Sequence, residues 1–179
     1  EEKRVIAVGR YVPQKGFDLL IEAWRNVADE HPDWSLFVYG EGNKEPYQKL
    51  VDKYNLNNCC HLESAKSDIA EFYANSSIFV LSSRFEGFGI VLLEAMSCGV
   101  PVVSFACPCG PRDIVHDGID GLLVSNGDTG QLAVKINYLI ENNDERKQMG
   151  LHAKENAKRY DITGIGQRWK NVFEKLMNL

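Results

Sequence analysis

The sequence has little that would suit a membrane-spanning, disulfide-stabilised or nucleic-acid-binding protein. No apolar run among its 179 residues approaches the ~20 residues that cross a bilayer. Lys and Arg number 20 against 25 Asp and Glu, whereas a general nucleic-acid binder presents a basic surface. The five cysteines are an odd number and lack the C-x-x-C pairs of zinc sites. We therefore expect reduced cysteines, no metal site and a cytoplasmic protein.

The sequence does contain a regular alternation of short apolar runs and amphipathic stretches. The runs predict strands at 5–8, 35–39, 60–62, 78–81, 100–105 and 122–124. The 3.6-residue periodicity predicts helices at 17–31, 46–54, 69–75 and 90–96, and two or three helical segments from 131 to the end, with a loop region at 110–121. Such alternation is typical of an α/β fold: a Rossmann-like parallel sheet with helices on both faces. We expect one domain over residues 1–179.

The beginning of the chain is unusual, because the first predicted strand starts by Arg4 and no Met precedes it. We expect the chain to be a piece of a longer protein that holds only half of an active site.

The loop after the first strand carries two cations. It reads Gly9-Arg10-Tyr11-Val12-Pro13-Gln14-Lys15-Gly16 and lies at the carboxyl end of a strand, where α/β sheets bind ligands. A diphosphate would meet both Arg10 and Lys15 there. The spacing alone does not exclude an ordinary surface loop with two solvated charges.

The loop after the fourth strand is rich in glycine and reads Ser82-Ser83-Arg84-Phe85-Glu86-Gly87-Phe88-Gly89-Ile90. A glycine turn that opens a helix presents free backbone N–H groups to an anion. Glu86 is expected in the turn and Glu94 within the helix. Glu94 stands in the apolar run 90–96, where a carboxylate is costly unless it has partners, so it is either a structural acid bonded to backbone groups or an acceptor for ligand hydroxyls. The nicotinamide fingerprint is weak, since Gly40-Glu41-Gly42 lacks its third glycine.

Three separated segments together carry a family resemblance that extends from about Val5 to the final helices. Residues 86–103 resemble the E-x7-E signature of retaining glycosyltransferases of the GT-B fold, glycosyltransferase group 1 (GT4). Gly9-Arg10 with Lys15-Gly16 is similar to that family's phosphate-binding loop. Residues 117–124 are similar to its D-G-x-N-G-x-L-V turn, with Asp120 in place of Asn, an exchange that we expect to matter little.

The resemblance implies a Rossmann-like C-terminal half that binds a nucleotide-sugar donor. The absent N-terminal half would bind the acceptor and contribute a His. Residue by residue, the resemblance places the diphosphate on Arg10 and Lys15 and on the backbone of Gly87, Phe88, Gly89 and Ile90. It places hydroxyls of the transferred sugar on Glu86, ribose hydroxyls on Glu94, and the base near residues 63–66.

The implied reaction moves a hexosyl group from a UDP-, GDP- or ADP-sugar to an acceptor with retained configuration. Arg10 and Lys15 would stabilise the charge that develops on the leaving diphosphate, with Glu86 as the third catalytic residue. No cofactor is implied, and the sequence has no D-x-D pair for a metal. Polysaccharide biosynthesis with peripheral attachment at the inner face of a membrane fits the family. The sugar, base and acceptor stay open.

Two alternatives are weighed against transfer: a non-catalytic nucleotide-sugar-binding or regulatory module, and another GT-B enzyme such as a sugar-nucleotide 2-epimerase. Other polar and aromatic residues receive simpler interpretations. The three tryptophans are expected to pack, the four histidines form no constellation, and Arg112 and Asp113 are placed towards the acceptor side. The tryptophans are Trp24, Trp34 and Trp169, and the histidines are His31, His61, His116 and His152.

Overall fold

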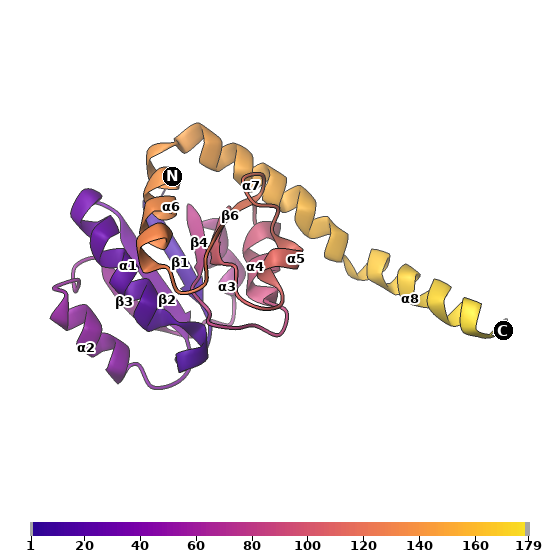
Figure 1. The fold of residues 1–179 in the computed structure, drawn as a ribbon, viewed down its shortest axis with the longest axis horizontal. Coiled ribbons are helices and arrows are strands. Elements are labelled where there is room, and N and C mark those ends of the chain that lie inside the picture. The colour runs from indigo at the N-terminus through magenta and orange to yellow at the C-terminus, as the bar shows by residue number, and fades with distance from the viewer. Residues whose placement is uncertain (1, 178–179) are drawn as a thin grey trace.

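The computed structural model describes residues 2–177 (Figure 1). The strands are β1 (Arg4–Val8), β2 (Ser35–Gly40), β3 (Cys60–Ser64), β4 (Ile78–Leu81), β5 (Val102–Phe105) and β6 (Gly121–Val124). The helices are α1 (Phe17–Glu30), α2 (Glu45–Lys53), α3 (Ile69–Ala74), α4 (Ile90–Ser97), α5 (Pro111–Ile114), α6 (Thr129–Glu141), α7 (Asn143–Ala157) and α8 (Ile162–Met177), with 3-10 turns η1 (Pro13–Lys15) and η2 (Lys158–Tyr160).

The six strands form one parallel sheet in the order β3-β2-β1-β4-β5-β6. Chain order runs outwards from β1 to one edge and from β4 to the other, so the order reverses between β1 and β4. In sheets of this kind, ligands bind outside the carboxyl ends of the strands at that reversal. The predicted Rossmann-like α/β architecture is confirmed.

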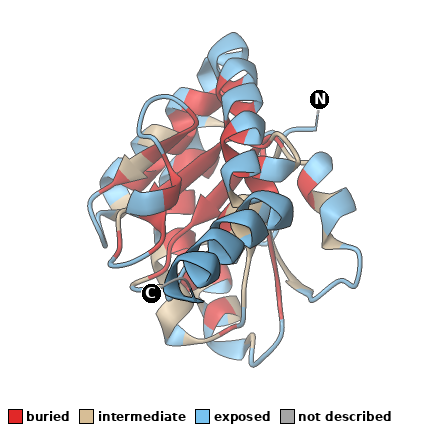
Figure 2. Cartoon of the chain, turned by 90° about the vertical axis from the view of Figure 1, so that its right-hand side faces the viewer, coloured by how far each residue is buried: buried red, intermediate tan, exposed pale blue. Residues whose placement is uncertain are grey.

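Helices cover both faces of the sheet and make two separate cores. On one face, α1, α2 and α6 pack on strand residues such as Val5, Val38 and Val103. On the other, α3, α4 and α7 pack on residues such as Ile6 and Phe79. The alternation of neighbours such as Val5 and Ile6 between the cores follows from the two-residue period of a strand. Figure 2 shows the buried layer between exposed outer surfaces.

Several predicted details are wrong. The region 110–121 contains helix α5, which begins at Pro111, a residue with a backbone already shaped for a first helical turn. Trp24 and Trp34 are buried as expected, but the Trp169 side chain lies on exposed α8.

All five cysteines are unpaired. None of the helices in the described part of the chain is long and apolar enough to cross a membrane.

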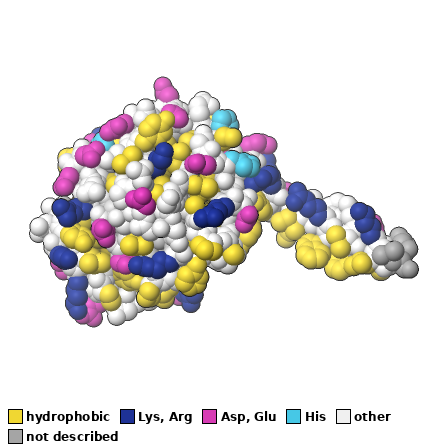
Figure 3. Space-filling model, viewed as in Figure 1, with side chains coloured by type: hydrophobic (Ala, Val, Ile, Leu, Met, Phe, Trp, Pro, Cys, Tyr) yellow, Lys and Arg dark blue, Asp and Glu magenta, His cyan; other side chains and the backbone are white. Residues whose placement is uncertain are grey.

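Helix α8 differs from the other long helices because it has no buried residue. It runs away from the sheet, and its apolar side chains gather along one side (Figures 1 and 3). These exposed residues are Ile162, Trp169, Val172, Phe173, Leu176 and Met177. A stripe of this size on one helix face is typical of a surface that is covered by a partner.

Candidate functional site

The loops after β1 and β4 meet at the reversal point of the sheet. The backbone N–H of Arg84 donates to the carbonyl of Gln14 (2.8 Å), and the Gln14 side-chain amide donates to the carbonyl of Phe85 (3.0 Å). The contact is close because Gly16 has no side chain: a Cβ there would lie 2.0 Å from the carbonyl oxygen of Ser82. The two glycine-containing loops therefore form one surface.

Lys15 and Glu86 form the centre of this surface. The Lys15 ammonium lies 2.8 Å from Glu86 Oε1, and the Ser83 hydroxyl donates to the same oxygen (2.6 Å). The exposed fractions are only 15% for the Lys15 side chain and 6% for Glu86. Two donors on one oxygen leave Oε2 of the carboxylate and the remaining ammonium protons for other partners. The arrangement can bind an anion and a hydroxyl side by side.

The turn that follows Glu86 presents backbone donors. Helix α4 begins after Gly89, which has φ of 86° and provides no side-chain cap, so the first N–H groups of the helix lack a capping side chain. Phe88 and Ile90 are exposed, and the space beside Gly87 is open. From below, Gly110 supports the turn at such close range that a Cβ would lie 2.0 Å from the Phe88 carbonyl oxygen. The start of α4 is thus accessible to an anion.

An ion pair that links the β4–α4 loop to the start of α1 was not predicted from the sequence. Both guanidinium nitrogens of Arg84 donate to the Asp18 carboxylate (2.8 and 2.7 Å), and one also donates to the Pro13 carbonyl (2.7 Å). Hydrogen bonding to Arg84 lowers the pKa of Asp18 below its usual range. Such a bidentate pair fixes orientation, so Arg84 holds the β4–α4 loop to the first turn of α1.

Arg10 occupies a different part of the same edge. It is exposed and lines a cavity of about 250 Å³ at the ends of β1, β2 and β3. Ala65 and Lys66, from the loop expected near the base, line the same cavity, as do Tyr39 and Ile69. Arg10 thus lies to one side of the Lys15–Glu86 centre, and the two cations do not form one paired cluster.

Glu94 lies on the exposed side of α4, not buried among the apolar residues that surround it in the sequence. One oxygen, Oε2, accepts a hydrogen bond from the Tyr73 hydroxyl of α3 (3.0 Å). Burial, and then the charge of Glu94, raises the pKa of Tyr73, so the phenol stays a donor. The expected desolvation cost is absent because the helix turns this carboxylate towards water, where ligand hydroxyls can reach it.

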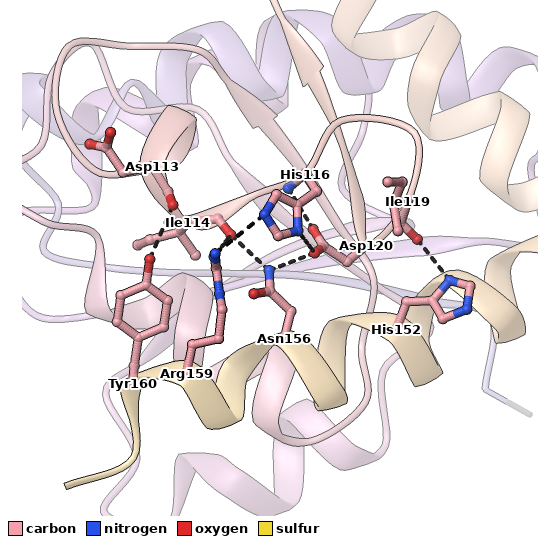
Figure 4. A network of polar contacts seen from close by, with 9 residues as sticks. All are labelled: Asp113, Ile114, His116, Ile119, Asp120, His152, Asn156, Arg159 and Tyr160. Atoms are coloured by element: carbon pink, nitrogen blue, oxygen red, sulfur yellow. Dashed lines mark hydrogen bonds and ion pairs between the residues drawn. The ribbon is translucent and has the colours of Figure 1, made fainter. Parts of the chain in front are cut away.

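Asp120 is the centre of a polar network between the β5–β6 connection and α7 (Figure 4). Its buried carboxylate accepts from the backbone N–H of His116 (2.8 Å), from the Asn156 amide (2.5 Å) and pairs with His116 Nδ1 (3.0 Å). Arg159 contacts the other ring nitrogen of His116 (3.3 Å). His116 therefore does belong to a constellation, contrary to the prediction. That the Asp120 exchange matters little stays a prediction.

The same network holds α5 in place below the glycine turn. The carbonyl of Ile114 accepts from Asn156 and Arg159, and the carbonyl of Asp113 accepts from Tyr160, whose ring meets Phe88 edge-on at 5.7 Å between centroids. Arg112 is exposed and donates to the carbonyl of Ala106 (2.8 Å). Its predicted position towards an acceptor stays a prediction.

Comparison with known proteins agrees with this geometry. Residues 1–156 match the family described as glycosyl transferases group 1. The amylovoran biosynthesis glycosyltransferase AmsD of Erwinia amylovora is 31% identical over 96% of this chain and 48% of its own length. The chain spans about half the length of the curated relatives it matches first.

Two solved structures share the fold closely. A Staphylococcus aureus TarM variant in complex with fondaparinux, α-GlcNAc-glycerol and UDP has a TM-score of 0.91 at 31% identity, over 96% of this chain and 35% of TarM. HepE of Anabaena in complex with UDP-glucose has a TM-score of 0.88 at 27% identity, over 100% of this chain and 50% of HepE. With its matching sequence, sheet and loops, the chain belongs to the group 1 glycosyl transferases.

Proposed function

We propose that this chain is the C-terminal, nucleotide-sugar-binding half of a retaining glycosyltransferase that moves a hexosyl group to an acceptor without a metal. The observation that carries the proposal is the largely buried Lys15–Glu86 pair beside the uncapped start of α4. That arrangement combines a cation, a carboxylate and backbone donors at the reversal point of the sheet, where ligands of such folds bind.

The diphosphate of the donor lies between Lys15, Arg10 and the N–H groups of residues 87–90. When the sugar–oxygen bond breaks, negative charge develops on the phosphate oxygen that leaves. Fixed positive groups stabilise this charge without reorganisation, and the positive end of α4 adds to them. Lys15 is already held in place by Glu86, so it needs little ordering when the donor binds. These cations take the role that a metal has elsewhere.

Two carboxylates hold the hydroxyls of the donor. Glu86 keeps Oε1 on Lys15 and Ser83 and accepts from a hydroxyl of the transferred sugar with Oε2. Glu94, oriented by Tyr73, accepts from the ribose hydroxyls. The base enters the cavity lined by Tyr39, Ala65 and Ile69. The complexes of TarM with UDP and of HepE with UDP-glucose favour a UDP-sugar among the candidate donors.

The acceptor-binding half of the enzyme covers the apolar stripe of α8. Support comes from two observations: relatives are about twice as long as this chain, and the stripe is exposed from Ile162 to Met177. The full enzyme acts in the cytoplasm, at the inner face of a membrane, in polysaccharide synthesis of the kind that the name of AmsD describes.

Titration calorimetry of the chain with UDP, GDP and ADP and their sugars tests donor binding. The sharpest variant is Arg10→Ala, because within the described residues the Arg10 side chain makes no hydrogen bond or ion pair, and the backbone hydrogen bond from Val12 to the Arg10 carbonyl is kept, so the substitution leaves the fold intact. We expect about a tenfold or greater loss of affinity, since a hydrogen bond to a charged group contributes about 1.5–3 kcal/mol. Lys49→Ala removes an exposed lysine of α2 as the matched control. No binding of any nucleotide at millimolar concentration would contradict the proposal.

Transfer itself is tested with the acceptor-binding half restored. We expect transfer in the presence of a chelator and product of unchanged anomeric configuration in its NMR spectrum. Donor binding without transfer or donor hydrolysis would instead support a binding or regulatory module. Epimerisation of the free sugar nucleotide would support the 2-epimerase alternative.

A further inference from the structure

A second group of ionisable side chains lies at the amino edge of the sheet, remote from the candidate site. Glu30 and His31 end α1, and Glu141 ends α6. One possible ligand atom from each of the three lies within 4.8 Å of the other two. Residues 30 and 141 are far apart in the sequence, so the packing of α1 on α6 brings them together.

His31 is incompletely satisfied in this group. Its Nε2 atom is shielded from solvent and has no hydrogen-bond partner in the described part of the chain. Glu141 Oε1 lies 3.5 Å away, beyond the usual range of a hydrogen bond. A buried ring nitrogen without a partner is costly. The position therefore calls for a proton or a cation between the ring and the carboxylate.

The local charges favour a cation. The carboxyl end of a helix is its negative end, yet the last turn of α1 holds Asp29 and Glu30 and no basic residue. At the carboxyl end of α6, the positive charge of Arg146 offsets the negative end of the helix, because Arg146 donates to the carbonyls of Leu139 and Ile140. Lys3 and Arg146 line the adjacent cavity, but Lys3 pairs with Asp33 and Arg146 donates to the α6 carbonyls. The acids at the end of α1 are therefore the negative groups beside His31 that have no basic residue in their own turn.

We propose that Glu30, His31 and Glu141 bind one divalent transition-metal ion, with Zn²⁺ as the best match. Bonds of about 2.1 Å at tetrahedral angles separate two zinc ligands by about 3.4 Å, close to the 3.5 Å between His31 and Glu141. Asn137 holds Glu30 Oε2 (2.8 Å), which leaves Oε1 for the ion and orients the ligand. An adjacent cavity of about 420 Å³ gives room for water as the fourth ligand.

The ion joins the ends of two helices and takes no part in the transfer reaction. Helices α1 and α6 follow β1 and β6, so they begin at the candidate site and end at the opposite edge of the sheet. The α1 helix also begins immediately after Lys15 and Gly16. The expected consequence of binding is greater stability of this helix pair rather than a change in chemistry.

Calorimetric titration of the reduced chain with ZnCl₂ at pH 7.5, with MgCl₂ in parallel, tests the site. We expect one zinc ion per chain, and a rise in melting temperature of about 5–10 °C when zinc is 100-fold above its Kd. His31→Gln should weaken zinc binding by more than about tenfold and abolish the thermal shift. His152→Gln is the matched control, because His152 is an exposed histidine of α7 outside the group.

The five free thiols are a competing source of zinc binding, so Co²⁺ is titrated as a spectroscopic probe. A site of one imidazole and two carboxylates gives no near-ultraviolet thiolate charge-transfer band. A thiolate band that accounts for all bound cobalt, zinc binding that survives in His31→Gln, or equal binding of magnesium would each overturn the proposal. Absence of zinc binding, with His31 protonated in its NMR titration instead, would overturn it as well.

Discussion

Glu86 and Glu94 lie only eight residues apart, yet their carboxylates differ in burial and in the number of side chains that hold them. Glu86 lies in a loop, 6% exposed, and is held by a lysine from one neighbouring loop and a serine from its own. Glu94 lies on a helix, exposed to water, with the Tyr73 hydroxyl on one oxygen. The first was desolvated and oriented when the chain folded. The second keeps most of its hydration, which a ligand would displace in the proposed complex.

This difference separates stability from binding. Removing a partner of Glu86 leaves a charge with little access to water, so the free energy of unfolding must fall. Removing the partner of Glu94 leaves a carboxylate that water can solvate. Substitutions at the two positions should therefore affect the free energy of unfolding and the affinity for nucleotide in different proportions.

Lys15→Met is expected to have the largest effect. Methionine keeps the unbranched stem, whose carbons lie close to Gly9, but removes the charge. Because Glu86 then loses its counter-ion in a nearly buried position, the free energy of unfolding should fall by about 3 kcal/mol. Urea denaturation followed by circular dichroism measures the change.

The double variant Lys15→Met/Glu86→Gln completes a thermodynamic cycle. Replacing the carboxylate by an amide removes the unpaired charge, so the double variant should be more stable than Lys15→Met alone. Equal stability of wild type and Lys15→Met would show that the pair is not a preorganised element, and the contrast with Glu94 would disappear.

Arg84→Gln should have a smaller effect, because the pair with Asp18 is 39% exposed on both sides. Arg84 lowers the pKa of Asp18, so the pair stabilises the fold above the unfolded pKa of about 3.9. That contribution is lost as pH falls through the lower pKa of the folded state. We expect the free energy of unfolding of the wild type to exceed that of the variant by about 1 kcal/mol at pH 7. This difference should shrink below pH 4. Urea titrations at several pH values test this, and a pH-independent difference would exclude an ionic origin.

The architecture could be predicted from the sequence because its causes are local. Alternating apolar and amphipathic segments fix the strands and helices, and the helix between each strand and the next fixes a parallel sheet. His31 ends α1 before Pro32, as the restriction on residues before proline predicts. The glycine turn and its two acids were also visible as a pattern. What failed locally was α5, whose four residues are too few for a periodic signal.

The contacts that orient the site could not be predicted in this way. Asp18 and Arg84 are 66 residues apart, and Asp120 and Asn156 are 36 apart, so nothing in either local pattern relates the partners. The exposure of Glu94 was also missed, because an acid within Ile90–Ser97 looks buried in the sequence. Only the packing of α4 on the sheet decides which of its sides faces water.

Tyr73→Phe should have the smallest effect and tests the exposed member of the comparison. Phenylalanine keeps the edge-on contact with Phe79 (5.8 Å between centroids) and removes only the hydroxyl that orients Glu94. Since water replaces that donor at an exposed carboxylate, the free energy of unfolding should fall by at most about 1 kcal/mol. UDP affinity, measured by calorimetry, should fall about threefold, because Glu94 must then be ordered by the ligand. A loss as large as that of Glu94→Gln would mean that the tyrosine itself contacts the nucleotide. No loss at all would mean that Glu94 does not bind the ribose in the orientation that Tyr73 gives it.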